Sequence, residues 1–202
     1  MAGAGRYVSR GGDKLKYAID HLRLGLAGAV AADFGCSTGG FTDCLLQEGA
    51  ARVYAIDTGY GALAWKLRQD KRVIVLERTN AMHVALPEPA DVVTVDVAWT
   101  AQRHILPNAL RQVKPDGAVL SLVKPQYEAP RHLLRRGLIA TADFDAVLAH
   151  VTAGLGELGL KVHEVVRLPQ DRRRKNPEAF LYVLRSECRP TPEFLRTDAE
   201  KE

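Results

Sequence analysis

The sequence predicts an α/β fold in which a mostly parallel sheet of seven strands has helices on both faces. Apolar runs of strand length alternate along the chain with segments in which apolar residues recur at helical spacing. Strands joined by helical crossovers form parallel sheets that are covered on both faces. The last two expected strands, 161–167 and 179–184, have no helix between them, which indicates an antiparallel pair at one edge. The expected architecture is therefore Rossmann-like, with an antiparallel edge strand.

The first helix is expected at 12–23. Its apolar residues recur at intervals of three and four positions, which places them on one face of a helix. They are Leu15, Ala18, Ile19 and Leu22.

The first strand is expected at 29–33, where a short apolar run leads straight into Gly35. The helix that follows, 38–48, is expected to stop at Gly49, because glycine is a natural C-terminal cap. The remaining strands are expected at 52–56, 73–76, 91–95 and 117–123, and the remaining helices at 61–69, 101–113 and 141–158.

The composition excludes several classes of protein. Hydrophobic residues make up 47% of the 202 residues and charged residues 26%, as in a globular chain and not as in a disordered, collagen-like or disulfide-stapled one. The apolar runs are too short to cross a bilayer, and the first residues lack the apolar stretch of a secretory signal. The cysteines, Cys36, Cys44 and Cys188, are odd in number, so we expect reduced thiols in a cytoplasmic protein.

Charge is unevenly distributed along the chain, although the net charge is only +4. Residues 31–100 are net negative, whereas 1–30, 101–136 and 161–178 are net positive. If the fold brings the three basic segments together, they form a cationic surface beside a less basic pocket. Ordinary solvated faces explain the same distribution, so charge alone leaves both interpretations open.

A glycine-rich turn at residues 33–40, Asp-Phe-Gly-Cys-Ser-Thr-Gly-Gly, joins the first sheet strand to a helix. Glycines let a backbone approach a ligand closely, and a helix N-terminus offers unpaired N–H groups. Asp57 ends the next strand, where nucleotide-binding α/β folds place an acidic residue that hydrogen-bonds ribose hydroxyls. A ligand of this kind would lie at the carboxyl ends of the strands.

Three functional interpretations of this turn compete. A dinucleotide site has the pattern G-x-G-x-x-G, but Ser37 stands where the second glycine belongs. A hydrolase elbow, G-x-S-x-G, matches residues 35–39, but the later histidines lie in no suitable loop. A pocket for S-adenosylmethionine (SAM) uses one acidic residue before the turn and another after the second strand, and Asp33 and Asp57 fit this pattern best. A turn that binds nothing is the fourth alternative.

Seven stretches of the sequence follow the pattern of one known family. They are residues 9–15, 33–43, 53–60, 76–80, 96–97, 123–128 and 176–178. They resemble the TlyA, or haemolysin-A-like, branch of the FtsJ-like RNA 2′-O-ribose methyltransferases. The run STGGFTD together with LVKPQYE makes the resemblance specific. It implies a class I SAM-dependent methyltransferase domain at 25–189, preceded by a segment and helix at 1–24 and followed by a polar tail at 190–202.

The resemblance also implies the site residues. A Lys-Asp-Lys-Glu catalytic tetrad would consist of Lys14, Asp96, Lys124 and Glu178. The SAM contacts would be Asp33, Gly35, Ser37, Thr38, Gly39, Gly40 and Phe41 around the turn, Asp57 at the ribose and Asn80 near the adenine. The cofactor product would be S-adenosylhomocysteine.

The chemistry suggests a role for each member of the tetrad. A ribose hydroxyl is a poor nucleophile while it is protonated, and a positioned base accelerates its reaction by about 10²–10⁴-fold. We expect Lys124 to be this base and Asp96 to orient it. Lys14 and Glu178 would hold the ribose. Lys124 must first lose its proton, which a second cation and partial burial favour and the two carboxylates oppose.

Basic residues near the expected site are candidates for contacts with RNA phosphates, which give affinity without base specificity. They are Arg6, Arg10, Arg131, Arg135, Arg136, Arg172, Arg173, Arg174 and Lys175. Trp99 and Tyr127 follow two site strands, and they either stack on an unpaired base or simply pack against the protein. The expected partner is ribosomal RNA (rRNA) or a ribosomal subunit, with no metal and no membrane.

Two rival functions and one question of organisation stay open. A SAM-dependent O-methyltransferase for small molecules would need a closed apolar pocket. An accessory SAM- or RNA-binding protein of haemolysin type would show little turnover. TlyA-like proteins carry a small RNA-binding S4 domain before the segment at 9–15, where this chain has about eight residues. We therefore expect either a stand-alone catalytic domain that lacks S4 or a shortened chain.

Overall fold

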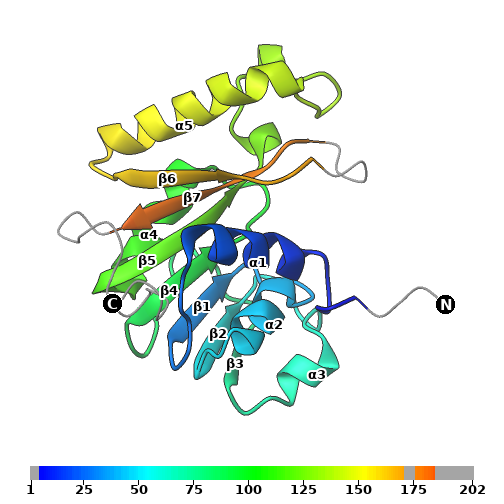
Figure 1. Cartoon of the computed structure of the whole chain (residues 1–202), viewed down its shortest axis with the longest axis vertical. Helices are drawn as coiled ribbons and strands as arrows, with labels where there is room; N and C mark the ends of the chain where they lie inside the picture. Colours follow the sequence, from blue (N-terminus) through cyan, green and yellow to red (C-terminus); the bar gives the residue numbers. More distant parts are fainter. Residues whose placement is uncertain (1–4, 171–175, 185–202) are drawn as a thin grey trace.

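The computed structural model describes residues 5–170 and 176–184, and its centre is a single seven-stranded sheet (Figure 1). The strands are β1 (Val30–Phe34), β2 (Arg52–Ile56), β3 (Val73–Leu76), β4 (Ala90–Val95), β5 (Val113–Val123), β6 (Val162–Arg167) and β7 (Ala179–Leu184). The helices are α1 (Gly11–Leu22), α2 (Gly40–Gln47), α3 (Trp65–Arg68), α4 (Gln102–Gln112) and α5 (Phe144–Glu157). Three short 3₁₀ helices are η1 (Pro125–Tyr127), η2 (Arg131–Leu133) and η3 (Thr141–Asp143).

The sheet order is β3-β2-β1-β4-β5-β7-β6. Pairing is parallel from β3 through β5, as the helical crossovers predict. β7 runs antiparallel to both β5 and β6. The expected antiparallel pair at one edge is thus confirmed, and β7 lies inside it while β6 is outermost.

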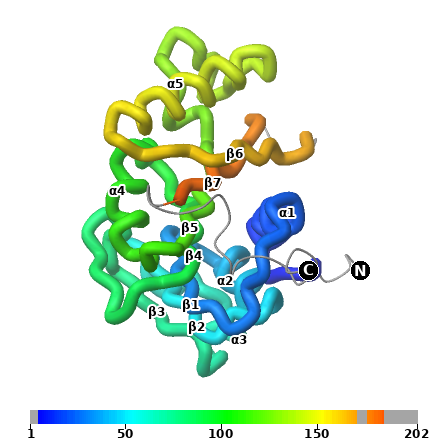
Figure 2. The backbone as a smooth tube through the Cα atoms, turned by 60° about the vertical axis from the view of Figure 1, so that its left-hand side comes forward, coloured from blue at the N-terminus to red at the C-terminus, as the bar shows by residue number. Residues whose placement is uncertain are grey.

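The sheet separates two layers of helices (Figure 2). On one face, α1, α2 and α3 bury Leu15, Leu45 and Leu67 against the sheet. On the other face, α4 and α5 bury Leu106 and Val147. The alternation of side chains along each strand supplies both cores, and this two-sided burial accounts for the nearly continuous apolar runs in the sequence.

Three expected elements have different lengths. The strand predicted at 117–123 is four residues longer, because β5 begins at Val113, which pairs with Ala90 directly after α4. The predicted helix 61–69 is reduced to α3, because Gly61 has a φ of +75° and Ala64 is extended with a ψ of 138°. The backbone therefore becomes helical only at Trp65. The last predicted helix begins as the 3₁₀ turn η3 and becomes α-helical at Phe144.

The parallel strands β1, β2, β4 and β5 all end at the same edge of the sheet, which faces right in Figure 1. The loops that follow them therefore lie side by side, and the N-terminal end of α1 lies there too (Figure 1). This edge is where open α/β sheets bind their ligands.

Candidate active site

The glycine-rich turn between β1 and α2 makes close backbone contacts. Gly35 has a φ of +85°, and a Cβ added there would lie 3.0 Å from the carbonyl oxygen of Asp96. Ser37 has a φ of +48°, which is uncommon for a residue with a side chain. The turn therefore passes directly beside the loop that follows β4, and a side chain at Gly35 would separate them.

Asp33, in β1, is fully buried and holds the start of α2. Its Oδ2 accepts hydrogen bonds from the Thr42 backbone N–H at 2.9 Å and from the Thr42 hydroxyl at 2.7 Å. Thr94 Oγ1 donates to Oδ1 at 3.2 Å. Burial raises the pKa of Asp33 to about 7, although the Thr42 hydrogen bond opposes the shift. Asp33 fixes the turn from behind and lines the cavity beside it, and its contact with SAM stays a prediction.

Asp57, at the end of β2, uses both carboxylate oxygens to fix loops. Oδ2 accepts from the Ser37 backbone N–H at 2.8 Å, and Oδ1 accepts from the Gly59 backbone N–H at 2.7 Å. Asn80, after β3, accepts from the Met82 backbone N–H at 2.9 Å. Both side chains line a cavity of about 460 Å³, whose wall also includes Trp99.

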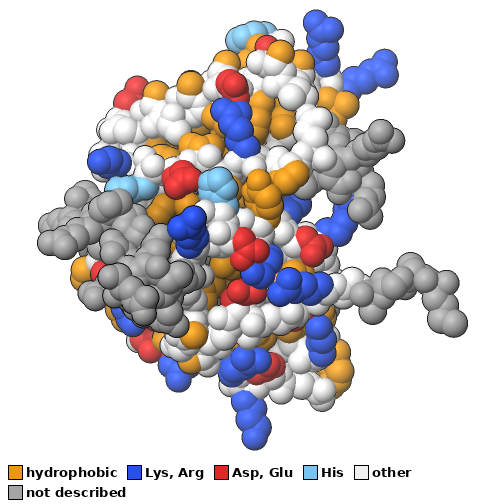
Figure 3. All heavy atoms as spheres, in the orientation of Figure 1, with side chains coloured by type: hydrophobic (Ala, Val, Ile, Leu, Met, Phe, Trp, Pro, Cys, Tyr) orange, Lys and Arg blue, Asp and Glu red, His pale blue; other side chains and the backbone are white. Residues whose placement is uncertain are grey.

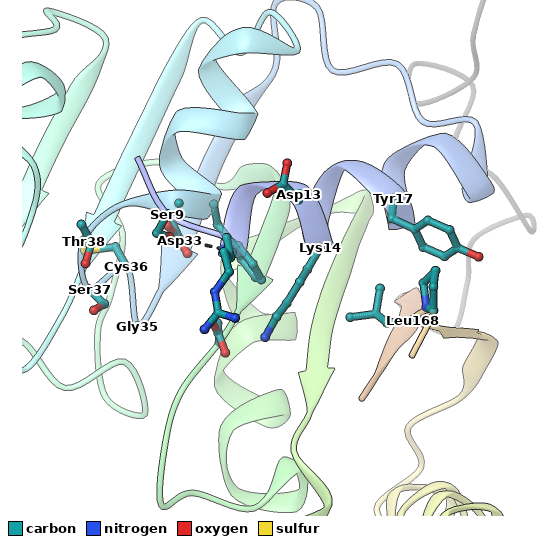
Figure 4. A pocket seen from close by; sticks show the side chains of 16 residues that line it. Ser9, Asp13, Lys14, Tyr17, Asp33, Gly35, Cys36, Ser37, Thr38 and Leu168 are labelled. Carbon is teal, nitrogen blue, oxygen red and sulfur yellow. Dashed lines mark hydrogen bonds between the residues drawn. The ribbon is translucent and has the colours of Figure 1, made fainter. Parts of the chain in front are cut away.

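A second cavity of about 550 Å³ lies on the α1 side of the turn. Figure 4 shows Lys14 and Tyr17 projecting from α1, with Ser37 and Thr38 at one end of the cavity and Leu168 at the other. Gly39 lies in the turn itself, while Gly40 and Phe41 begin α2, and both of these line the cavity. The two cavities share three wall residues, which are Gly35, Ser37 and Asp96.

The four residues of the predicted tetrad form two ion pairs at this edge. Lys124 Nζ lies 2.6 Å from Asp96 Oδ1, and Lys14 Nζ lies 2.7 Å from Glu178 Oε2. Asp96 Oδ1 is buried, and the Lys124 ammonium is the group that neutralises it. The four side chains are between 13% and 25% exposed, which makes solvent screening weak.

The two pairs also act on each other. Burial raises the pKa of Asp96 above its ordinary value. The positive charges of Lys124 and Lys14 oppose this shift, and the negative charge of Glu178 adds to it. The fold thus brings together four charges from α1, from the ends of β4 and β5, and from the residue before β7.

Trp99 is the most exposed large apolar residue of the site, with 85% of its surface accessible. Its ring centroid lies 5.1 Å from that of Tyr127, and the two planes are tilted by 46°. Trp99 also has a φ of +61°, which costs backbone energy in a residue with a side chain. Neither the exposure nor the backbone conformation is typical of a residue that only fills a core.

The structure places one of the predicted RNA contacts, Arg10, directly at the site. Arg10 lines the larger cavity, and Arg6 lies 3.7 Å from Glu48. Arg131, Arg135 and Arg136 are exposed on the segment between β5 and α5. Figure 3 shows Lys and Arg side chains along the right-hand side of the molecule, with acidic side chains among them. Residues 172–175, like Cys188 and the tail 190–202, lie outside the described residues.

Several residues that hold the site together were missed by the sequence analysis. Asp43 accepts from the Val8 backbone N–H at 2.9 Å and pairs with Lys66 at 2.9 Å. It thereby ties the segment that leads into α1 to α2. Its position inside the specific run STGGFTD was the available signal.

Asn176 and Glu128 were missed as well. Asn176 Oδ1 accepts from the Ile139 backbone N–H at 2.9 Å, and its Nδ2 donates to Gln126 Oε1 at 3.1 Å. It therefore links the loop after β5 to the residues before β7. Glu128 accepts from the Gln102 backbone N–H at 2.8 Å. Both residues belong to stretches that match the family pattern, but nothing local in the sequence showed their partners.

Three further properties concern the described residues. Cys36 and Cys44 are buried free thiols. Within residues 5–170 and 176–184, no group of three or more His, Cys, Asp or Glu side chains has the arrangement of a metal site. Among the helices of the same residues, none is long and apolar enough to span a membrane.

The sheet order with its reversed seventh strand, the glycine turn and the acid after β2 define a Rossmann-like fold of the SAM-dependent methyltransferase class. The N-methyltransferase NodS of Bradyrhizobium japonicum shares this fold, with a TM-score of 0.60 at 16% identity over 85% of this chain and 95% of that one. The chain belongs to the FtsJ-like methyltransferase family, whose profile matches residues 7–186. The resemblance seen in the sequence is confirmed at this level.

More similar proteins carry the names TlyA and hemolysin. The 16S/23S rRNA (cytidine-2′-O)-methyltransferase TlyA of Mycobacterium tuberculosis is 45% identical over 125 residues, which cover 60% of this chain and 47% of TlyA. Hemolysin A of Brachyspira hyodysenteriae is 35% identical over 77% of this chain and 68% of its own length. The crystal structure of a candidate hemolysin from Lactococcus lactis has a TM-score of 0.83 at 33% identity, over 93% of this chain and 96% of that one. The chain spans about half the length of the first curated relatives that it matches.

Proposed function

We propose that this protein transfers a methyl group from SAM to ribose 2′-oxygens of rRNA. Family membership supports methyl transfer, and the relatives named as rRNA cytidine-2′-O-methyltransferases support the substrate. This substrate would place the protein in the cytoplasm. One observation carries the proposal. Two ion pairs, Lys124–Asp96 and Lys14–Glu178, lie beside the residues that the two cavities share.

The residues around the glycine turn fit SAM. The missing side chain at Gly35 keeps the backbone open next to Asp96, where a Cβ would lie against the carbonyl oxygen. Asp57 has acceptor oxygens at the end of β2, suited to ribose hydroxyls. Asn80 lies on the wall of the same cavity, where it would bind near the adenine. The turn residues 37–41 would hold the amino-acid end.

When bound, SAM supplies a methyl group that is activated by the neighbouring sulfonium charge. The protein supplies position and a base. Lys124, once neutral, accepts the proton of the attacking 2′-hydroxyl through Nζ. Asp96 fixes the Nζ atom of Lys124 through its side chain and, at 3.3 Å, through its backbone carbonyl. Lys14 and Glu178 would hold the ribose from the α1 side of the cavity.

The larger cavity would receive the target nucleotide, because Arg10 and Lys14 place positive charge on its wall. Phosphate binding by Arg131, Arg135 and Arg136 would orient the RNA without reading its sequence. Trp99 presents aromatic surface at the neighbouring cavity and has Tyr127 beside it, which suits an unstacked base.

The test is transfer of labelled methyl groups from SAM to unmodified rRNA and to ribosomal subunits, followed by digestion to nucleosides. The proposal predicts a labelled 2′-O-methylnucleoside. Label in a methylated base would contradict the position of transfer. SAM binding without label in any RNA would contradict the proposal and favour the accessory or small-molecule function.

A further inference from the structure

Two loops carry most of the candidate site, and they are joined at three points. The loop 96–101 follows β4 and holds Asp96 and Trp99. The segment 124–128 follows β5 and holds Lys124 and Tyr127. We propose that Glu128 is a positioning residue, which caps α4 and thereby fixes the loop 96–101 against Lys124 and Tyr127.

The helix α4 has 11 residues and begins at Gln102. Its N-cap residue is Ala101, whose methyl side chain cannot accept a hydrogen bond. The Gln102 backbone N–H instead donates to Glu128 Oε1 at 2.8 Å. Because a helix N-terminus carries partial positive charge and unpaired N–H groups, a carboxylate at this place stabilises it. The cap is therefore supplied by another loop.

The side chain of Gln102 is only 2% exposed and is held by β5. Its Nε2 donates to the Leu122 carbonyl oxygen at 3.1 Å, and its Oε1 accepts from the Ser121 hydroxyl. Gln102 is thus held to β5 by its side chain and to Glu128 by its backbone. The end of the loop 96–101 is fixed on the same strand that carries Lys124.

Three contacts follow one another along the loop 96–101 and the segment 124–128. Lys124 meets Asp96 at one end, Tyr127 meets Trp99 in the middle, and Glu128 meets Gln102 at the other end. The loop between these points contains the positive φ of Trp99, whose side chain is almost fully exposed. A conformation of this kind persists only when its surroundings hold it. Glu128 supplies one of the few contacts able to do so.

The charge state of Glu128 makes this contact sensitive to pH. Burial raises the pKa of Glu128 to about 7, and the Gln102 backbone N–H opposes the shift. When the loop is closed the pKa of Glu128 is higher than its ordinary value of 4.5, so the closed arrangement binds the proton more tightly than an open, solvated one. The closed arrangement therefore loses stability as pH rises from about 4.5 to about 7, where the buried carboxyl must ionise. The titratable side chains on the neighbouring segments are Arg103, His104, Asp96, Lys124, Tyr127 and Arg131. Among the described residues, none of these shifts the pKa of Glu128.

The fluorescence of Trp99 reports whether the loop 96–101 is ordered, and this measurement does not require catalysis. The chain has two tryptophans, so a Trp65→Phe background leaves Trp99 as the only one. Trp65 lies on α3 and is 72% exposed. In this background we expect Glu128→Ala to lower the fluorescence anisotropy of Trp99, because the loop becomes mobile. Glu128→Gln keeps an acceptor for the Gln102 N–H and should retain the anisotropy.

The pH dependence of the Trp99 anisotropy distinguishes the titration of Glu128 from the titration of other groups. His83 and His104 line the same shallow pocket as Trp99, so they also contribute to its signal. The anisotropy of the Trp65→Phe protein should fall as pH rises from about 5 to about 8, and the part of this fall that Glu128 contributes should be missing in Glu128→Gln. A profile that is identical in both proteins would overturn the proposal, and it decides the matter even if Glu128→Ala does not fold.

The matched control is Asp91→Ala. Asp91 is a buried acid that accepts from the Val30 backbone N–H at 2.8 Å, but it lies at the opposite end of the sheet. It should lower stability without changing the Trp99 signal. An equal loss of anisotropy in Asp91→Ala would mean that Glu128 acts only through general stability, and would overturn the proposal.

A second test measures kcat for RNA methylation, and it rests on the proposed function. At pH 7 we expect Glu128→Ala to lower kcat for RNA methylation by about 10- to 100-fold, and Glu128→Gln to restore most of it. A wild-type kcat and anisotropy in Glu128→Ala would contradict the positioning role. If the wild-type protein methylates no RNA, the proposed function fails, while the anisotropy experiment still tests Glu128.

Discussion

Lys124 Nζ lies 2.6 Å from Asp96 Oδ1, and this ion pair joins the ends of two adjacent parallel strands. The strands β4 and β5 pair with Val95 beside Ser121, so their ends are fixed by the register of the sheet. The geometry of the pair is therefore inherited from the core and does not depend on flexible loops alone. A base held in this way loses little freedom when a substrate arrives.

The second ion pair should matter for turnover more than for folding. Glu178→Gln removes the charge opposite Lys14 but keeps the shape of the side chain. We expect methyl transfer to fall by about 100-fold and the free energy of unfolding by only about 1–2 kcal/mol, because glutamine keeps an oxygen that accepts from Lys14 Nζ where Glu178 Oε1 does, at 3.0 Å. Single-turnover kinetics and urea unfolding measure the two effects.

The control for this variant is a carboxylate that pairs with a different lysine of α1. Glu48→Gln removes a carboxylate that lies 3.6 Å from Lys16, on the surface formed by α1 and α2. Its methyl transfer should match that of the wild type. An equal loss of activity in both variants would show that α1 is generally sensitive and that the Lys14–Glu178 pair has no special role.

Two glycines with similar backbone conformations allow the effect of backbone strain to be distinguished from the effect of the close contact with Asp96. Gly35 has a φ of +85° and faces the Asp96 carbonyl oxygen, whereas Gly28 has a φ of +77° and open space around it. Both Gly→Ala variants should lose about 1–2 kcal/mol of stability from the backbone alone. Only Gly35→Ala should also weaken SAM binding, by at least about tenfold, as measured by calorimetry. Equal SAM affinity in the two variants would place SAM elsewhere.

The buried acid Asp33 should make stability depend on pH. In the folded protein its pKa is raised to about 7, from 3.8 in an exposed aspartate, mainly by burial. Between these values the folded state binds more protons than the unfolded state, so stability falls as pH rises from about 4 to 7.

Asp33→Asn cannot ionise and removes this decline. The Tm of the wild type minus the Tm of Asp33→Asn should therefore be larger at pH 5 than at pH 8, by about a few °C. The difference between the two proteins isolates Asp33 from Glu128, whose pKa is also raised to about 7. A constant difference across this pH range would show that Asp33 stays ionised in the fold.

The exposed arginines between β5 and α5 should control the salt dependence of RNA binding. We expect the triple variant Arg131→Ala, Arg135→Ala, Arg136→Ala to bind rRNA more weakly, with the slope of log affinity against log salt reduced by about 2–3. Binding measured from 50 to 300 mM salt gives the slope. An unchanged slope would show that these residues do not contact phosphates.

Most of the sheet could be predicted from the sequence, because buried strands such as β4 are rich in β-branched residues. The helix 12–23 was predicted equally well, since Leu15, Ala18 and Ile19 are all buried on one face. The length of α3 could not be predicted. It depends on the backbone of Gly61 and Ala64, which the contacts of two loops determine.

The candidate site was predictable only in part. Asp57 could be placed from the sequence because it ends a strand that points to the ligand edge. The partners of Glu128 and Asn176 could not, since each contact joins segments at least 26 residues apart and depends on how β4, β5 and β7 are aligned. The tetrad itself followed from the family pattern and not from local spacing.

The most direct test of the account compares two lysine variants of similar geometry. Lys124 pairs with Asp96 at the carboxyl edge of the sheet, and Lys114 pairs with Asp91, also at 2.6 Å, at the opposite edge. The measurement is the yield of labelled 2′-O-methylnucleoside from SAM and unmodified rRNA. The account predicts that Lys124→Ala abolishes this product while SAM still binds, and that Lys114→Ala retains it. Full product from Lys124→Ala would contradict the central claim that Lys124 is the base for ribose methylation.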